Sequence, residues 1–238
     1  MSQLLLIRHA QASFLAAEYD NLSEKGLEQS TLLGHYLAEQ GHQFDHAYVG
    51  TLRRQQQTYQ KVKEAYLDRE LSFPKATILP ELNEYKGMDV MGTVRQELTE
   101  RHPNFKEWFK EMDERPNHKT KMKMVVTYLN MWATGTLGFD LPIGAKKYDE
   151  FKATAQLGLQ KIMTGNDQGK SIAAFSSGGC IAAMLGKVVG TNDNGKTMGF
   201  NLVMRNTAIN EVLFSGNRLS LKTFNALPHL TEEMITTM

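Results

Sequence analysis

The sequence has a single cysteine, Cys180, among its 238 residues, so no disulfide can form within the chain. Few cysteines are typical of proteins from reducing compartments. No segment reaches the ~20 consecutive apolar residues of a membrane span. The apolar run at residues 4–7 is too short for a secretory signal, and charge follows it instead of preceding it. These absences predict a cytoplasmic protein that does not bind a membrane.

No charge of one sign dominates the composition. Lys and Arg together number 27, Asp and Glu 26, and the formal net charge is +1 at pH 7. This total gives no electrostatic reason to expect nucleic acid as a partner, so any site for an anion must be built locally. The hydrophobic fraction of 41% is ordinary for a globular protein with a sizeable core.

Short apolar segments alternate with helical patterns along most of the chain. Residues 4–7 form a continuous apolar run, which is typical of a strand buried on both faces of an α/β sheet. Further strands are predicted at 47–49, 76–79 and 171–175, a hairpin at 208–214 and 219–224, and helices at 23–40, 52–67, 146–163 and 179–189. This alternation predicts a three-layer α/β/α sandwich with a mostly parallel sheet.

The block at residues 85–150 has a different character. It is strongly charged and helical in period, with interruptions at Pro103 and Pro116. We predict that residues 1–238 form one domain, in which residues 85–150 are a helical insertion, or cap, over the carboxyl ends of the strands. Substrate pockets are often built in such segments.

Two of the predicted strands end in residues suited to phosphate. The first ends at Arg8 and His9, and the fourth runs through Ser177 into a glycine-rich helix start. Ligands of open α/β sheets bind beyond the carboxyl ends of the strands. A guanidinium group and the amides of a helix N-terminus both favour phosphate, and a neutral imidazole can attack phosphorus. If the two strands are neighbours, these residues form a phosphate site.

The ordered segments IRHAQAS, LSEKGLEQSTLLGHYL, TLRRQQQT, PELNEY and FSSGG together resemble the histidine phosphatase superfamily, which includes the cofactor-dependent phosphoglycerate mutases. The resemblance extends from residue 4 to the C-terminal segments NTAINEVLF and FNALPHL and leaves only the middle block unmatched. It implies a phosphatase that forms a phosphohistidine and needs no metal or cofactor. Its substrate would be a small phosphorylated compound.

The resemblance also assigns roles to individual residues. His9 corresponds to the nucleophile, Arg8 and Arg54 to the phosphate-binding arginines, and Glu84 to the general acid. Two guanidinium groups would neutralise the phosphate dianion and hold phosphorus in line with the imidazole. Glu84 would need a raised pKa to protonate the leaving alkoxide. Gln11 and Ser13 either donate to the same phosphate or belong to an ordinary loop.

Two positions depart from the family pattern. Ala10 follows His9 where the family has glycine, and Ser177 stands where the family usually has a second histidine that donates to the phosphoryl oxygens. Loss of such a donor costs roughly 10²–10³ in rate by analogy with an oxyanion donor. A branch of the superfamily carries Ser-Gly-Gly here, so we expect the Ser177 hydroxyl and the Gly178 amide to complete a weakened pocket.

Five alternatives stay open at this point. Glu81 lies three residues before Glu84 and could exchange roles with it, and His229 could fold back to replace the missing histidine. The chain order Ser177, Asp193, His229 imitates an α/β-hydrolase triad, but Phe175 breaks the Gly-x-Ser-x-Gly pattern. The protein could also be a phospholigand-binding relative without efficient turnover, or a mutase. The sequence favours phosphomonoester hydrolysis and leaves the substrate and the oligomeric state open.

Overall fold

A computed structural model describes residues 1–13, 20–166 and 168–237. Six strands form one mixed sheet in the order β3-β2-β4-β1-β5-β6. The strands are β1 (Ser2–Arg8), β2 (His46–Val49), β3 (Ala76–Ile78), β4 (Ser171–Ser176), β5 (Ile209–Ser215) and β6 (Arg218–Ala226). The first four are mutually parallel, and the β5–β6 hairpin is antiparallel. The predicted mixed, mostly parallel sheet is confirmed.

Strand β1 is central because its residues are apolar on both faces. Leu4 and Leu6 face one side of the sheet and Leu5 and Ile7 the other, and all four are buried. In the register between β1 and β4, Arg8 lies opposite Ser176. Both strands therefore end at the same edge of the sheet, where the His9 amide donates to the Ser176 carbonyl at 2.8 Å.

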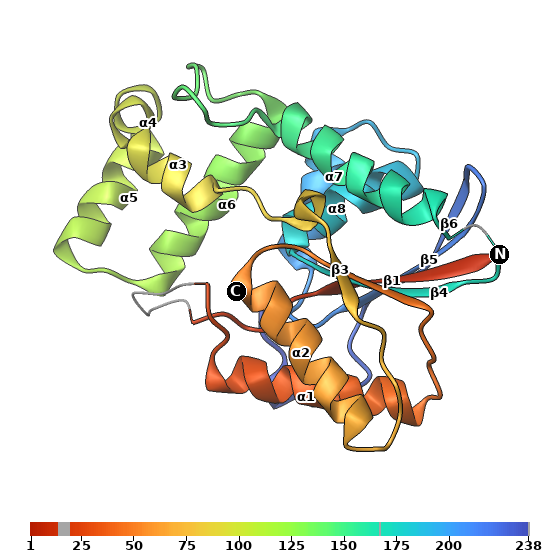
Figure 1. The fold of residues 1–238 in the computed structure, drawn as a ribbon. Helices are drawn as coiled ribbons and strands as arrows, with labels where there is room; N and C mark the ends of the chain where they lie inside the picture. The colour runs from red at the N-terminus through yellow and green to blue at the C-terminus, as the bar shows by residue number, and fades with distance from the viewer. Residues whose placement is uncertain (14–19, 167, 238) are drawn as a thin grey trace.

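Helices cover both faces of the sheet (Figure 1). On one face lie α1 (Glu24–Glu39) and α2 (Arg53–Leu67), and on the other lie α7 (Tyr148–Thr164) and α8 (Gly178–Val188). The predicted N-cap is correct, because the Ser23 hydroxyl accepts from the Gly26 amide. Helices α1 and α2 pack side by side, and a Cβ at Gly34 would come within 2.6 Å of the Ala65 Cβ.

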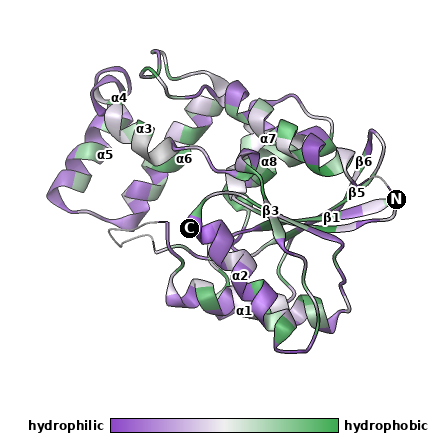
Figure 2. Cartoon of the chain, viewed as in Figure 1, coloured by the Kyte–Doolittle hydropathy of each residue, from purple (hydrophilic) through white to green (hydrophobic). Residues whose placement is uncertain are grey.

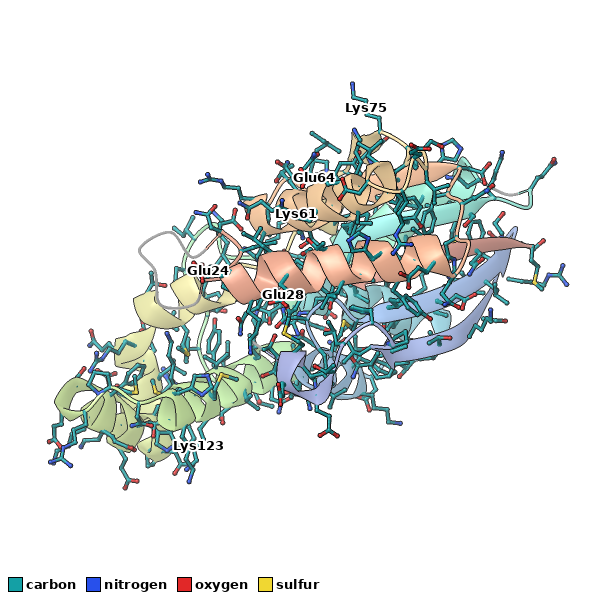
Figure 3. All side chains as sticks on the ribbon, turned by 90° about the horizontal axis from the view of Figure 1, so that it is seen from below. Glu24, Glu28, Lys61, Glu64, Lys75 and Lys123 are labelled. Carbon is teal, nitrogen blue, oxygen red and sulfur yellow. The ribbon has the colours of Figure 1, made fainter. Side chains whose placement is uncertain are left out.

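The polar faces of α1 and α2 point to solvent. Figure 3 shows Glu24 and Glu28 of α1 and Lys61 and Glu64 of α2 on the outer side of this layer. Most of α2 is coloured as hydrophilic in Figure 2, which matches its sequence RRQQQTYQKVKEAYL. Its buried stripe, including Val62 and Tyr66, packs on the sheet with Leu33 of α1. This amphipathic pattern holds α2 in place and fixes its N-terminal turn at the sheet edge.

The middle block folds into four helices, α3 (Gly87–Thr93), α4 (Arg95–Arg101), α5 (Pro103–Glu114) and α6 (His118–Thr134). Pro103 starts α5, as expected of a residue without an amide hydrogen, and Gly135 ends α6 with a φ of 70°. These helices lie on the side of the molecule away from the labelled N-terminus of β1 (Figure 1). Their apolar residues, among them Leu98 and Phe105, share one core cluster with Leu4 and Leu6 of β1.

One helix was not predicted from the sequence. Helix α9 (Asn194–Val203) follows α8, and the Asp193 side chain caps it by accepting from the Lys196 amide. Its two glycines and its polar residues hid the helical period. Within the described part of the chain, no helix combines the length and the apolar character needed to cross a membrane.

Candidate active site

His9 lies at the end of β1 with its ring almost fully buried. Its Nδ1 is 2.7 Å from the Ala10 carbonyl oxygen, which can only accept a hydrogen bond, so Nδ1 carries the proton. Its Nε2 is 3.1 Å from Arg54 Nε, which can only donate, so Nε2 presents its lone pair. Burial, Arg54 and Arg8 together lower the pKa of His9 well below its ordinary value. The imidazole is therefore neutral, with a defined tautomer suited to nucleophilic attack through Nε2.

Two buried arginines flank this ring. Arg54 comes from the first turn of α2, so residues 45 positions apart in the chain meet at the sheet edge. Its Nη1 forms an ion pair with Asp20 at 2.6 Å. Arg8 precedes His9 on β1, and its Nη1 donates to the Met204 carbonyl. Both guanidinium groups are concentrated in a site with little water, where they favour a bound anion.

Glu84 faces the same edge from the segment that follows β3. Its Oε2 accepts from the Gly179 amide at 2.9 Å, and its Oε1 accepts from the Tyr85 amide at 3.1 Å. Burial raises the pKa of Glu84 above its ordinary value, although these amides and the two arginines oppose the shift. Glu81 instead pairs with Lys161, which lowers its pKa. Of the two glutamates, the geometry favours Glu84 as a proton donor.

The turn between β4 and α8 approaches Glu84 at its glycines. A Cβ at Gly179 would come within 2.4 Å of both Glu84 Oε1 and Tyr85 Cε1, and a Cβ at Gly178 within 2.6 Å of Asn201 Oδ1. Neither position has space for a side chain. The Ser177 hydroxyl is fully buried and accepts from Gln55 Nε2 at 2.8 Å. Because Gln55 supplies a proton to this oxygen, the hydroxyl hydrogen of Ser177 can be donated elsewhere.

Replacing Gly179 by alanine is expected to lower kcat/KM by roughly 10²-fold, because a displacement of about 1 Å in a catalytic group has an effect of this size. The new methyl group would push Glu84 and Tyr85 aside. Gly199→Ala is the matched control, since a Cβ there meets nothing within 4 Å and the residue lies in α9. Steady-state kinetics on an aryl phosphate check the result. Equal rates for the two variants would contradict the described position of Glu84.

Buried polar side chains hold the backbone that carries His9. Asn206 Nδ2 donates to the His9 carbonyl at 3.1 Å, and the Ala10 amide donates to Thr58 Oγ1 at 3.1 Å. The Gln11 amide donates to Gln29 Oε1 at 2.9 Å. Thr236 joins two of these supports, because its hydroxyl accepts from Gln29 Nε2 and donates to Asn206 Oδ1. Side chains from four segments distant in sequence therefore hold the backbone of the His9 loop.

The other predicted phosphate ligands lie on this loop. Gln11 Oε1 accepts from the Ser23 hydroxyl at 2.9 Å, so its side-chain oxygen serves the cap of α1. The Ser13 amide donates to the Asn21 carbonyl at 2.8 Å. The Gln11 side-chain oxygen is thus engaged at the start of α1, and the contact of Ser13 fixes its backbone.

The residues of the alternative hydrolase triad do not meet. Ser177 is bonded to Gln55, Asp193 caps α9, and His229 Nε2 contacts Thr207 Oγ1 at 2.9 Å. Burial lowers the pKa of His229 to about 4. His229 supports Thr207 on the carbonyl side of the His9 loop and does not occupy the place of the missing histidine.

Three residues at the site were missed by the sequence analysis: Asp20, Gln55 and Asn201. Asp20 and Asn201 lie between the recognised segments and not within them, and no spacing rule links them to His9. Asn201 Nδ2 donates to the Tyr85 hydroxyl at 3.1 Å, beside Gly178. Gln55 directly follows Arg54 on the predicted helix. Successive helical residues point in different directions, so this position alone gave no reason to place Gln55 at the site with Arg54.

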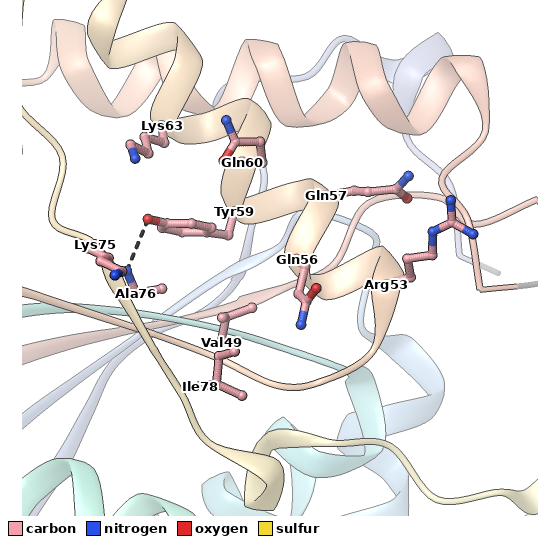
Figure 4. Close-up of a pocket in the computed structure, with 10 residues that line it drawn as sticks. All are labelled: Val49, Arg53, Gln56, Gln57, Tyr59, Gln60, Lys63, Lys75, Ala76 and Ile78. Carbon is pink, nitrogen blue, oxygen red and sulfur yellow. Dashed lines mark hydrogen bonds between the residues drawn. The ribbon is translucent and has the colours of Figure 1, made fainter.

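Arg53, the helix neighbour of Arg54, lines an outer groove of about 490 Å³. Figure 4 shows its side chain beside this groove, between α2 and β3. Tyr59 and Lys75 also line this groove, and the Tyr59 hydroxyl accepts from the Ala76 amide. His9, Arg8 and Glu84 are not among its lining residues. Across residues 1–13, 20–166 and 168–237, no three or more His, Cys, Asp and Glu side chains gather as a metal site would require.

Comparison with known proteins identifies the family of the chain. The model of the histidine phosphatase superfamily (branch 1) matches residues 4–227, so the chain belongs to this superfamily. No curated protein matches the chain in sequence. The predictions of the superfamily and of the α/β sandwich are confirmed, and membership of this superfamily supports the predicted phosphatase class.

Solved structures of similar fold cover nearly the whole chain. One is a mutant phosphoserine phosphatase from Entamoeba histolytica in complex with phosphoserine, with 18% identity, a TM-score of 0.64, and coverage of 97% of this chain and 100% of that chain. A putative alpha-ribazole-5'-P phosphatase from Escherichia coli has 17% identity, a TM-score of 0.63 and the same coverage. A mycobacterial glucosyl-3-phosphoglycerate phosphatase complexed with VO3 has 17% identity, a TM-score of 0.63, and coverage of 95% and 100%. At these identities the likeness establishes the fold.

Proposed function

We propose that this chain hydrolyses small phosphate monoesters through a phosphohistidine on His9. The observation that carries the proposal is the neutral, single-tautomer imidazole, whose Nε2 faces the guanidinium of Arg54 at 3.1 Å. An anion that enters between these groups meets a nucleophile on one side and positive charge around it. A metal or cofactor has no part in the proposed reaction.

In the first step the phosphate is held by Arg8 and Arg54, and His9 Nε2 attacks phosphorus. The N–P bond forms, the P–O bond to the leaving group breaks, and Glu84 gives its proton to the leaving oxygen. In the second step the Glu84 carboxylate takes a proton from water, and the water oxygen attacks phosphorus. The N–P bond breaks, its electron pair returns to Nε2, and inorganic phosphate leaves.

The remaining predicted ligands complete the phosphate pocket in this proposal. The Gly178 amide at the start of α8 and the hydroxyl of Ser177, which Gln55 orients, donate to the phosphoryl oxygens. Gln11 and Ser13 take a supporting part, because they follow His9 directly on the loop. Residues 85–150 act as an insertion within one domain that covers the site, and the protein works in the cytoplasm.

A binding protein without turnover is the second candidate, because Ser177 replaces a cationic donor with a neutral hydroxyl. The buried environment of Glu84 argues against it. A protein that only binds a phosphorylated ligand gains nothing from a buried carboxyl group with a raised pKa in the same pocket as two arginines. No specific feature favours a mutase, which must retain the phosphoryl group and transfer it back to a small acid.

Trapping the intermediate tests the proposal. The chain is mixed with a phosphate-labelled aryl phosphate, quenched in alkali and analysed for label on the protein. We expect label that survives alkali and is released by acid, as a phosphoramidate bond requires, and that is absent from His9→Ala. His35→Gln is the matched control, since His35 lies on α1 and accepts from Arg69. Label of equal amount in His9→Ala would refute the proposed nucleophile.

A further inference from the structure

The Asp20 carboxylate pairs with Arg54, the arginine that contacts the proposed nucleophile His9. Its Oδ1 pairs with Arg54 Nη1 at 2.6 Å, and its Oδ2 accepts from the Arg53 amide at 2.8 Å. Leu52, the N-cap residue of α2, provides no side-chain acceptor. The Asp20 carboxylate therefore meets both a guanidinium group and a helix N-terminus, which are the two elements that phosphate also prefers.

The two partners of this ion pair differ in how firmly they are held. The Arg54 side chain is 8% exposed and is also bonded to His9, whereas the Asp20 side chain is 42% exposed. Ion pairs with an exposed partner contribute little, about 0–1 kcal/mol. A phosphate dianion, with more charge and more acceptor oxygens than a carboxylate, can displace Asp20 from Arg54.

The same geometry gives Arg54 two side-chain partners before any ligand enters. Its Nε is directed to the His9 lone pair and its Nη1 to Asp20. Productive binding of phosphate requires that Arg54 turn donors toward the phosphoryl oxygens, because His9 Nε2 must be free to attack. Asp20 opposes this change through its hydrogen-bonded ion pair and through its repulsion of the incoming dianion.

We propose that Asp20 competes with phosphate for Arg54. The Asp20 carboxylate leaves the Arg54 guanidinium when substrate binds and returns to it when inorganic phosphate departs. This inference rests on the proposed function, because it takes the site between His9 and Arg54 as the phosphate site. Asp20 acts through Arg54 and is a positioning residue. Its effect is to weaken the binding of product phosphate and so to limit product inhibition.

Asp20→Asn tests the inference, because the amide oxygen can still accept from the Arg53 amide while the negative charge is lost. We expect the Ki for inorganic phosphate to fall roughly two- to tenfold relative to wild type. A role that is only structural predicts the opposite sign, since a misplaced Arg54 binds phosphate more weakly. Isothermal titration with inorganic phosphate on the full chain gives a second reading of the same affinity.

Glu39→Gln is the matched control, because the Glu39–Arg69 pair is also exposed and lies at the far end of α1. Its Ki should equal that of wild type. An unchanged or higher Ki in Asp20→Asn, with Asp20→Ser as the second variant if the first does not fold, would overturn the competitor role alone. Absence of phosphate binding in wild type would overturn the proposed function together with it.

Discussion

Replacing His9 with alanine is expected to lower kcat for hydrolysis of an aryl phosphate by at least about 10³-fold, because the proposed covalent intermediate forms on His9. His9 is the only imidazole among the described residues that contacts Arg54. Arg8 and Arg54 remain in the variant, so inorganic phosphate should still bind. Initial rates and phosphate titration measured on the same preparation separate the lost chemistry from the retained binding.

The outcome distinguishes the two candidate functions. A histidine phosphatase loses turnover and keeps phosphate affinity in His9→Ala, whereas a binding protein has no turnover to lose. His229→Ala serves as the control for a half-buried histidine near the loop, because His229 contacts Thr207. Rates for His9→Ala within about twofold of wild type would exclude a covalent role for this residue.

Glu84→Gln is expected to lower kcat/KM by roughly 10²–10⁴, the usual range for a general acid. The loss should be larger for alkyl phosphates than for p-nitrophenyl phosphate, because a nitrophenolate leaves without a proton. Glu81→Gln is a close control, since Glu81 lies three residues earlier and pairs with Lys161. If Glu81→Gln proves the more damaging change on alkyl phosphates, the acid has been assigned to the wrong glutamate.

The pH dependence follows from the two shifted pKa values. The proposed chemistry needs His9 neutral and Glu84 protonated at the same time. With ordinary pKa values of 6.5 and 4.5, about 1% of molecules would meet both conditions at the best pH. Burial lowers the pKa of His9 and raises that of Glu84, so both shifts enlarge this fraction.

The signs of these shifts predict a bell-shaped pH profile for kcat/KM, with a larger active fraction at its maximum than ordinary pKa values would give. As pH rises through the raised pKa of Glu84, the acid is lost and activity falls; as pH falls through the depressed pKa of His9, the nucleophile is lost. Glu84→Gln should abolish the decline on the alkaline side that belongs to this group and leave the acidic decline in place. A pH–rate profile of the variant with the same alkaline decline as wild type would disprove the assignment.

Sequence reasoning located the parts of the site that belong to strand ends. His9 and Ser177 could be placed because apolar strands followed by polar turns meet at one edge of a parallel sheet. The pairing of His9 with Arg54 followed only from the family resemblance. Asp20 and Asn201 were out of reach, because their contacts depend on how a loop and an unpredicted helix pack in three dimensions.

The hydrogen-bond partner of Ser177 could not be predicted from the sequence, for a different reason. The sequence indicates a hydroxyl where a histidine is usual, yet only the packing of α2 against β4 reveals that Gln55 donates to it. A side-chain hydrogen bond between residues 122 positions apart leaves no periodic signal in the sequence. The strands, the main helices and the β5–β6 hairpin were predictable because each repeats a pattern over several neighbouring residues.

The supports of the His9 loop are amides and hydroxyls: Asn206, Thr58, Gln29 and Thr236. None of these groups gains or loses a proton between mild acid and mild alkali, and none depends on an attraction that dissolved ions weaken. Changes of acidity or ionic strength therefore act on the charged groups around the ring without dismantling the scaffold behind it. An enzyme whose activity declines away from its optimal pH would regain that activity on return to the optimum without having to refold.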